Sequence, residues 1–426
     1  MEGGNGPLSS AQSAAILERL KDRSGETSLF DRHVAVEQSF VDSPLFVGNH
    51  VTLLKDGPAT YRAMFAAIRQ AKDHINLETY IIEDDEVGGK FSDLLIEKKK
   101  QGVQVSMIYD SVGAINAPRE FFERLEGSGI RTLEFNPVNP LEGKNKTSIN
   151  HRDHRKLLIV DGRLAFLGGI NISSVYSAGS AGKSKPVATG KDKKGNSVPW
   201  RDTHVQIEGP VVAQYQKLFL ETWEKQKGEP LEGGRYFPKL ENVGKEIVRA
   251  VGSEGDEPYS QIYVTLVSAI NSAESYIYLT NAYFVPDPQL RDALKDAVRR
   301  GVDVRIIVPS QTDFGLVFHA GRSHYTELLR AGVKIYERQG ALLHSKTALI
   351  DGVWSCVGST NLDWRSFMHN NEIDAVVLGI SFAQQLRVMF EDDLKESKEV
   401  DLKQWQRRSV TVRMKEWSAR LWEYWL

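Results

Sequence analysis

The sequence predicts an α/β protein made of two similar halves, and three observations support this prediction. Strand-like and helix-like stretches alternate along most of the 426 residues. The stretches occur twice in the same order, and a similar short polar pattern follows each set. Alternating strands and helices with crossover-length spacing indicate a sheet with much parallel character. A chain of this length also suits two domains of roughly 200 residues each.

The first half begins with an apolar stretch at 75–82, whose composition is typical of a strand. A helix is expected from about 91 to 101, because a glycine follows it, and a strand at 103–109 comes next. Another helix then leads to a glycine and a short strand at 130–135.

The second half repeats this order. A strand is expected at 276–284, a helix at 288–300 and a strand at 302–308, again with a glycine after the helix. A further helix, a glycine and a short strand at 333–336 complete the copy. Because these elements recur in one order, we interpret the chain as a tandem repeat.

Composition divides the chain further. The predicted divisions are an N-terminal segment (1–44), a first domain (45–228), a connector (229–256), a second domain (257–400) and a C-terminal segment (401–426). Proline, glycine and glutamate are frequent around the connector, which favours irregular structure. An insertion at 177–199 in the first domain predicts a basic surface loop. Its lysines are Lys183, Lys185, Lys191, Lys193 and Lys194.

Bulk properties exclude several classes of protein. The formal net charge of -2 gives no global attraction to nucleic acid. The single cysteine, Cys356, excludes an intrachain disulfide. No run of 18 apolar residues and no signal peptide occur, so any membrane contact is expected to be peripheral. No His, Asp or Glu cluster has the spacing of a metal site, and we expect neither a metal nor another cofactor.

A polar pattern that carries chemistry follows the matching strands of each half. It consists of a histidine, a lysine two residues later, an aspartate, two small residues and an asparagine. The members are His154, Lys156, Asp161, Gly168, Gly169 and Asn171, and then His344, Lys346, Asp351, Gly358, Ser359 and Asn361. One full copy should occur by chance on the order of once in 10⁴ chains of this length, and two copies far more rarely.

An Asp-Gly pair between two apolar runs predicts a tight hairpin in each half. With a two-residue type I′ turn, the residues on either side of Asp-Gly pair with each other. The expected opposite pairs are His154–Gly169, Lys156–Leu167, His344–Ser359 and Lys346–Val357. Histidine and lysine then lie on one face of the strand. A small residue opposite each histidine leaves room for a phosphate to approach the backbone.

These residue types suit phosphoryl transfer. Lys156 and Lys346 supply fixed positive charge where a phosphoryl group gains negative charge. Of His154 and His344, one attacks phosphorus while the other protonates the leaving alkoxide. We therefore predict an enzyme that breaks and remakes phosphodiester bonds through a covalent phosphohistidine.

The other residues of the pattern support this chemistry. The phosphate-binding candidates are Asn171, Asn361, Gly169 and Ser359. Asp161 and Asp351 complete the catalytic pattern, although their position favours a structural role in the turn over proton transfer. Each imidazole needs an acceptor on its second nitrogen. Asp202 and Glu372 each begin an alternating strand after their pattern, so they are candidates to orient the histidines, with strand-end salt bridges as the alternative.

At these residues the chain resembles the phospholipase D (PLD) superfamily, whose signature is His-x-Lys-x4-Asp-x6-Gly-Gly/Ser-x-Asn in duplicate. More narrowly, it resembles bacterial cardiolipin synthases over roughly residues 45–395. The stretches that carry this resemblance are 76–81, 109–113, 150–156, 200–205, 283–287 and 370–372.

The resemblance implies two similar α/β/α-sandwich domains in tandem, with the active site at their interface. It also implies transfer of a phosphatidyl group between two phosphatidylglycerol molecules at a bacterial cell membrane, without metal, and His154 as the nucleophile. Anionic phospholipid is then the expected partner. The alternatives are a lipid hydrolase of the same fold, a nuclease, and a lipid-binding module without activity.

The last segment is rich in tryptophan and positive charge. From Lys403 onward it contains four of the eight tryptophans, and six Lys or Arg against two Glu. Its apolar residues recur at helical spacing, which predicts an amphipathic helix with a basic face. They are Val410, Met414, Trp417, Leu421 and Trp425. We expect this helix either to dock on an anionic membrane or to cap the second domain.

Overall fold

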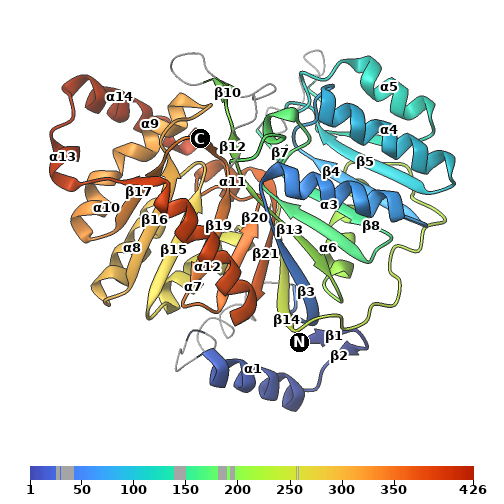
Figure 1. Cartoon of the computed structure of the whole chain (residues 1–426), viewed down its shortest axis with the longest axis horizontal. Helices are drawn as coiled ribbons and strands as arrows, with labels where there is room; N and C mark the ends of the chain where they lie inside the picture. Colours follow the sequence, from blue (N-terminus) through green and yellow to red (C-terminus); the bar gives the residue numbers. More distant parts are fainter. Residues whose placement is uncertain are drawn as a thin grey trace.

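The structure is a computed structural model that describes residues 1–24, 29, 43–138, 150–180, 190–191, 197–255, 257 and 259–426. The two halves of the chain lie side by side (Figure 1). Helices cover a mixed sheet that runs through both halves, which confirms the predicted α/β class. Most of the lysine-rich insertion at 177–199 lies outside the described residues.

The strands of the first half follow the order β6–β5–β4–β8–β9–β13–β3. They are β3 (Phe46–Lys55), β4 (His74–Thr79), β5 (Gln104–Asp110), β6 (Arg131–Phe135), β8 (Lys156–Val160), β9 (Leu164–Gly168) and β13 (Thr203–Glu208). The helices are α3 (Asp56–Gln70), α4 (Glu86–Lys100), α5 (Arg119–Gly127) and α6 (Val212–Lys225), with the 3-10 turn η1 (Ser174–Tyr176).

The second half follows the equivalent order β17–β16–β15–β19–β20–β21–β14. Its strands are β14 (Glu246–Ser253), β15 (Tyr276–Asn281), β16 (Asp303–Pro309), β17 (Lys334–Arg338), β19 (Lys346–Ile350), β20 (Trp354–Gly358) and β21 (Asn370–Leu378), with β22 (Ser397–Glu399) beside β17. Its helices are α7 (Gln261–Ser272), α8 (Pro288–Arg299), α9 (Gly315–Ser323), α10 (Tyr325–Ala331), α11 (Trp364–Met368) and α12 (Ile380–Lys395).

The outer strands of each half pair in parallel. β4, β5 and β6 run parallel to one another, as do β15, β16 and β17, whereas the inner neighbours of β4 and β15 are antiparallel. The halves join where β14 pairs with β3. β14 lies inside the stretch 229–256 that composition predicts as a connector, and the part before it, 229–245, contains neither helix nor strand.

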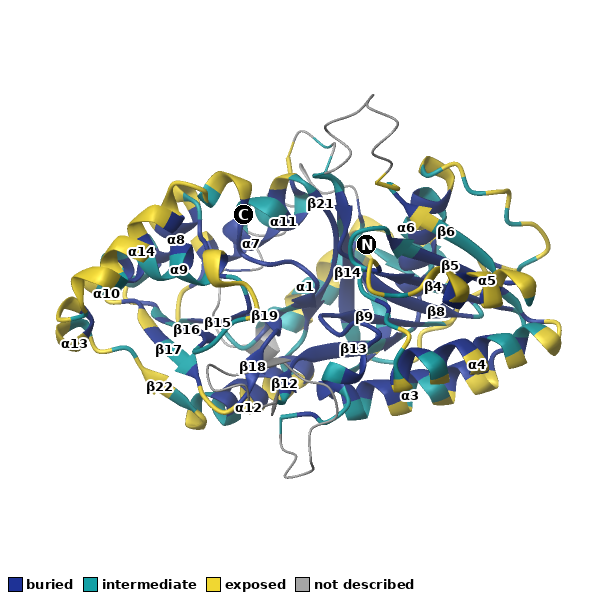
Figure 2. Cartoon of the chain, turned by 90° about the horizontal axis from the view of Figure 1, so that it is seen from above, coloured by how far each residue is buried: buried dark blue, intermediate teal, exposed yellow. Residues whose placement is uncertain are grey.

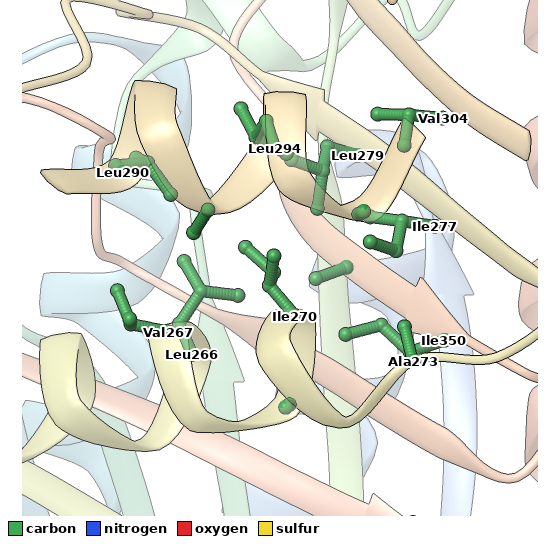
Figure 3. Close-up of a cluster of buried hydrophobic side chains, with 14 of the residues drawn as sticks. Leu266, Val267, Ile270, Ala273, Ile277, Leu279, Leu290, Leu294, Val304 and Ile350 are labelled. Atoms are coloured by element: carbon green, nitrogen blue, oxygen red, sulfur yellow. The ribbon is translucent and has the colours of Figure 1, made fainter. Parts of the chain in front are cut away.

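Apolar packing between helices and sheet fixes each half. In the second half, Figure 3 shows Ile270 of α7 and Leu294 of α8 directed at Ile277 and Leu279 of β15. All four side chains are fully buried or nearly so, and each such burial contributes about 1.5–3 kcal/mol. The carboxylate of Asp287 accepts a hydrogen bond from the N–H of Leu290 and so begins α8.

The two hairpins contain one more residue than predicted. Asp161 and Gly162 form the expected turn, with φ of 53° and 61°, and the N–H of Arg163 donates to the carbonyl of Val160. The ladder, however, pairs Val160 with Leu164. The predicted register is therefore wrong by one residue, because Arg163 is left outside the ladder. The second hairpin has the same turn and the same shift.

Short strands cross between the two halves. β7 (Arg152–Asp153) lies parallel to the first residues of β21, and β12 (Trp200–Arg201) lies parallel to β18 (Leu342–Leu343). Each exchange places a strand that leads into a histidine beside a strand of the opposite half. That neighbour contains Glu372 in the case of β21 and ends directly before Asp202 in the case of β12. Elsewhere, β10 (Gly190–Lys191) pairs with β11 (Ser197–Val198).

The two ends of the chain pack on this body. At the N-terminus, β1 (Glu2–Gly3), β2 (Gly6–Pro7) and α1 (Ser10–Ser24) precede the first half. At the C-terminus, α13 (Leu402–Gln406), α14 (Val410–Arg420) and η2 (Glu423–Trp425) follow β22, and α14 lies beside α9 (Figure 1). Glu416 and Ala419 of α14 are buried. Figure 2 shows the outer side of this helix largely exposed.

Candidate active site

The strand exchanges bring both histidines to one place. Directly after β7, the N–H of His154 donates to the carbonyl of Asn371 at 2.9 Å. Directly after β18, the N–H of His344 donates to the carbonyl of Arg201 at 2.8 Å. Both histidines line a cavity of about 420 Å³ between the halves, which is a typical size for a small-molecule site.

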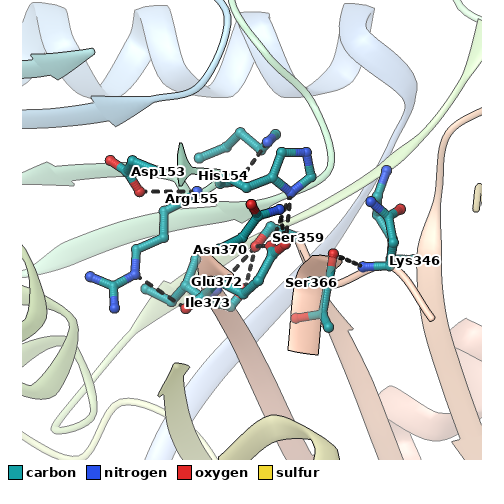
Figure 4. Close-up of polar contacts among 12 residues, drawn as sticks. Asp153, His154, Arg155, Lys346, Ser359, Ser366, Asn370, Glu372 and Ile373 are labelled. Carbon is teal, nitrogen blue, oxygen red and sulfur yellow. Dashed lines mark hydrogen bonds and ion pairs between the residues drawn. The ribbon is translucent and has the colours of Figure 1, made fainter. Parts of the chain in front are cut away.

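Each histidine is hydrogen-bonded to a carboxylate from the opposite half. Nδ1 of His154 lies 3.0 Å from both oxygens of Glu372, and Nδ1 of His344 lies 2.8 Å from Asp202. Figure 4 shows the Glu372 carboxylate pointing at the ring of His154. An acceptor at Nδ1 fixes the proton on that nitrogen and leaves Nε2 for a ligand. The sequence predicts both acids but not which histidine each one contacts.

Gly169 and Ser359 pack against these two acids and do not line the cavity. A Cβ atom at Gly169 would stand 2.2 Å from Oδ1 of Asp202, so only glycine leaves room for that carboxylate. Ser359 is fully buried, and its hydroxyl donates to Glu372 at 2.5 Å. These contacts take the place of the predicted approach of a phosphate to the backbone. His154 and His344 precede β8 and β19 and pair with the opposite half, so the hairpins do not set Gly169 or Ser359 across from them.

The two lysines lie behind the histidines. Nζ of Lys156 donates to the carbonyl of His154, and Nζ of Lys346 donates to the carbonyl of His344. Burial lowers the pKa of Lys156 to about 7 and that of Lys346 to about 8, although the carboxylate of Glu372 opposes both shifts. Either lysine therefore changes charge near neutral pH.

Burial also governs the titration of the histidines. It lowers the pKa of His154 well below its ordinary value, and the charges of Lys156 and Lys346 lower it further. Burial and the charge of Lys346 lower the pKa of His344, and Asp202 opposes this shift. The lowered pKa of His154 favours the neutral imidazole, which is the form that a nucleophile requires. The charge of Asp202 opposes the shift of His344 and so favours the protonated form that a general acid requires.

The two asparagines of the pattern line the cavity, unlike the two aspartates. Asn171 donates to the hydroxyl of Tyr176 at 3.0 Å, and Oδ1 of Asn361 has no hydrogen-bond partner within the described part of the chain. The carboxylates of Asp161 and Asp351 each accept hydrogen bonds from three consecutive backbone N–H groups, at the other end of their strands. We therefore assign the two aspartates to the turns and not to catalysis.

Further side chains complete the walls of the cavity. Tyr80 contacts the ring of His154 at 5.1 Å, and Trp200 contacts that of His344 at 5.3 Å. Arg152 and Arg365 also line the cavity. Tyr80, Arg152 and Trp200 fall within the stretches that carry the family resemblance, whereas no pattern in the sequence points to Arg365.

Among the described residues, no helix is both long and apolar enough to span a bilayer. The same residues contain no group of three or more His, Cys, Asp or Glu side chains placed to hold a metal ion.

Comparisons with known proteins agree with this geometry. A phosphatidylserine synthase from Haemophilus influenzae Rd KW20, whose crystal structure is known, superposes with a TM-score of 0.65. The superposition covers 92% of this chain and all of that one at 14% identity, and so it supports the fold alone.

Sequence comparisons are more specific. A cardiolipin synthase from Geobacillus sp. (strain WCH70) is 36% identical over 381 residues, which cover 89% of this chain and 73% of that protein. Another from Alkalihalophilus pseudofirmus is 34% identical and covers 95% of this chain and 77% of its own length. The family model described as cardiolipin synthase, PLD-like domain, matches residues 64–177 and 266–394. On these matches, the chain belongs to the cardiolipin synthase family with PLD-like domains.

Proposed function

We propose that the protein transfers a phosphatidyl group from one phosphatidylglycerol to another and forms cardiolipin and glycerol. The observation that carries this proposal is the pair of carboxylate-bound histidines that face one cavity. Membership of the cardiolipin synthase family supports the choice of lipid.

The reaction has two balanced steps. In the first, Nε2 of neutral His154 attacks phosphorus of the donor, and the bond from phosphorus to the oxygen of the headgroup glycerol breaks. Protonated His344 gives that oxygen its Nε2 proton and becomes neutral. In the second, His344 takes a proton from a hydroxyl of the acceptor, whose oxygen attacks phosphorus and breaks the bond to His154. Lys156 and Lys346 stabilise the extra negative charge in both transition states.

The test is to incubate the purified protein with phosphatidylglycerol alone, in EDTA, and to identify the products. We expect cardiolipin and glycerol in equal amounts. Phosphatidic acid as the main product would mean that water is the acceptor and would replace the proposal with a lipid hydrolase. Cleavage of an oligonucleotide but not of the lipid would favour a nuclease.

An anionic membrane surface is the partner that the C-terminal segment suits. The five apolar residues with helical spacing are all exposed, at 64–68% of their full area. Large exposed apolar patches mark sites of protein or membrane contact. Arg413, Lys415 and Arg420 are exposed on the same helix, and each cation near an anionic surface contributes about 1 kcal/mol.

This patch continues to the opening of the cavity. Trp425 and Leu426 line the cavity together with Phe314, and Phe314 and Trp425 are 49% and 65% exposed. A lipid could therefore pass from the bilayer to the histidines without crossing water. Flotation with vesicles tests the proposal: binding should increase with the phosphatidylglycerol content and weaken in high salt. Equal binding to neutral vesicles would contradict the charge contribution.

A further inference from the structure

The cavity has two different sides. Around His344 the walls are aromatic, with Tyr176, Trp200 and Tyr283 at ring distances of 6.0, 5.3 and 6.2 Å. Arg152 and Arg365 also line the cavity, and the charges of both act on Tyr80, whose ring lies 5.1 Å from that of His154. These two are the only arginine or lysine side chains among the described residues that line the cavity.

The two arginines break the internal repeat. Arg152 stands two residues before His154, and the equivalent position before His344 is Leu342. Arg365 stands four residues after Asn361, and the position four residues after Asn171 is occupied by a valine. The repeated histidines, lysines and asparagines form the proposed site for the one phosphate that reacts. The two arginines have no counterpart in the other half of the repeat and lie on one side of the cavity.

The surroundings of the arginines suit an anion. Arg152 is buried and held by Asp110 at 3.7 Å and by the hydroxyl of Ser111 at 2.8 Å. Arg365 is partly exposed, and its guanidinium contacts the side-chain and backbone oxygens of Asn150 at 3.4 and 3.3 Å. Within the described part of the chain, Arg365 forms no ion pair with a carboxylate.

The charges of the two arginines act on each other. Burial lowers the pKa of Arg152, Asp110 opposes this shift, and the charge of Arg365 adds to it. A bound anion would relieve the repulsion between the two guanidinium groups. Arginine also matches the geometry of a phosphate, because it donates two parallel hydrogen bonds.

The spacing between Arg152 and His154 fits the distance between the phosphate and the reacting hydroxyl of the acceptor lipid. Arg152 and His154 are two residues apart on an extended segment, so their side chains point to the same side about 7 Å apart. The donor lipid has one phosphate, which must lie at the histidines. A phosphatidylglycerol acceptor has a second phosphate that does not react, and one glycerol unit separates it from the reacting hydroxyl.

We infer that Arg152 and Arg365 form a second phosphate subsite, which binds the phosphodiester of the acceptor lipid and holds its free glycerol hydroxyl at the histidines. The inference rests on the proposed function, because only a phosphate-bearing acceptor uses such a subsite. It gives a physical reason for choosing phosphatidylglycerol over water or an uncharged alcohol.

A competition experiment tests this subsite. Labelled phosphatidylglycerol serves as donor in detergent micelles, and phosphatidylglycerol and monoacylglycerol compete as acceptors. Both acceptors have a glycerol end and an acyl chain, but only the first has a phosphate. The ratio of the two products measures the relative kcat/KM for the acceptors and does not depend on the amount of active protein.

In Arg365→Gln, the ratio of cardiolipin to the monoacylglycerol product should fall about tenfold or more, because a charged hydrogen bond to phosphate is lost. Arg365→Lys keeps the charge and should recover part of the ratio. Arg163→Gln removes the same charge from the hairpin turn at the far end of β8 and should leave the ratio as in the wild type. Water-soluble glycerophosphoglycerol, used in place of the lipid acceptor, should show the same loss.

Three results would overturn the subsite. An unchanged ratio, with both products reduced in parallel, would place Arg365 at the reacting phosphate or in the fold. A loss with phosphatidylglycerol but not with glycerophosphoglycerol would mean that the arginine attracts the micelle surface. A product ratio in Arg365→Lys as low as that in Arg365→Gln would show that the positive charge at position 365 does not determine the choice of acceptor. If the wild type forms neither product, the proposed function itself fails, which is a different outcome.

Discussion

Nδ1 of His154 lies 3.0 Å from both carboxylate oxygens of Glu372, a residue 218 positions later in the chain. His344 has the reciprocal contact with Asp202 from the first half, at 2.8 Å. Neither half therefore contains a complete histidine–carboxylate pair. Each half supplies a histidine to one pair and an acid to the other, so both pairs form only when the halves pack together.

The crossed acids are predicted to control kcat. Glu372→Gln should lower kcat on the order of 10²–10⁴-fold with little change in KM, because an amide no longer fixes the proton on Nδ1. Asp202→Asn should have an effect of similar size through His344. Steady-state kinetics with phosphatidylglycerol measure both values. A rise in KM with kcat unchanged would mean that the acids position substrate instead.

The two histidines should differ when the intermediate is trapped. If His154 is the nucleophile, His344→Ala should retain more phosphatidyl label on the protein after an acid quench than His154→Ala, because the second step lacks its base. Labelled donor lipid and denaturing electrophoresis give the measurement. If the label appeared only in His154→Ala, His344 would be the nucleophile and His154 the acid and base.

The order of elements in each half was predictable because it depends on local periodicity. The expected strand at 302–308, for example, is β16 (Asp303–Pro309), and the expected helix at 288–300 is α8 (Pro288–Arg299). The crossing of β7 to β21 and of β12 to β18 was not predictable. It depends on pairing between residues about 140 to 220 positions apart, which no local pattern encodes.

Some details of the site could not be predicted from the sequence for a related reason. The Asp-Gly turns were identified correctly, but a single unpaired residue after each turn shifts the register of the hairpin. The sequence also revealed the apolar stripe on α14 without revealing its direction. Contacts with α9 use the opposite face, and the stripe points to solvent.

The turn aspartates are predicted to affect stability and not catalysis. The Asp351 carboxylate accepts hydrogen bonds from the N–H groups of Glu274, Ser275 and Tyr276 at 2.8–2.9 Å. Asp351→Ala should lower the free energy of unfolding by about 1–3 kcal/mol, because these donors lose their acceptor. Asp351→Asn keeps one acceptor oxygen, and asparagine tolerates a positive φ. It should therefore lower the free energy of unfolding by less than Asp351→Ala. Thermal denaturation and the kcat of the folded fraction test this prediction. A large fall in kcat at unchanged stability would mean that Asp351 is a catalytic residue.

The pH profile should report the buried lysines. With pKa values of about 7 for Lys156 and about 8 for Lys346, both are charged below this range and neutral above it. Because the proposed role of the lysine charge is to stabilise negative charge on the reacting phosphoryl group, kcat/KM, which reports the free enzyme, should fall as the pH rises through 7–8. The phosphodiester of the substrate does not titrate there. An alkaline limb near pH 10, the ordinary range of lysine, would contradict the predicted effect of burial.

The C-terminal segment is predicted to have two separable roles. Trp405 of α13 is buried, and the side chains of Arg408 and Glu416 form an ion pair at 2.8 Å, so removal of residues 403–426 should destabilise the second half. Trp417 and Leu421, in contrast, are 67% and 64% exposed.

The double variant Trp417→Ser and Leu421→Ser should therefore keep its melting temperature, since exposed substitutions change stability by only about 0.5 kcal/mol. It should bind phosphatidylglycerol vesicles more weakly, because it loses apolar area that inserts into the interface. Turnover of a short-chain, water-soluble substrate should be retained. Val388→Ser on α12 removes a similarly exposed apolar side chain, at 59%, and serves as the matched control. Vesicle binding equal to that of the wild type in the folded double variant would exclude α14 as the docking surface and leave the helix as a cap on α9.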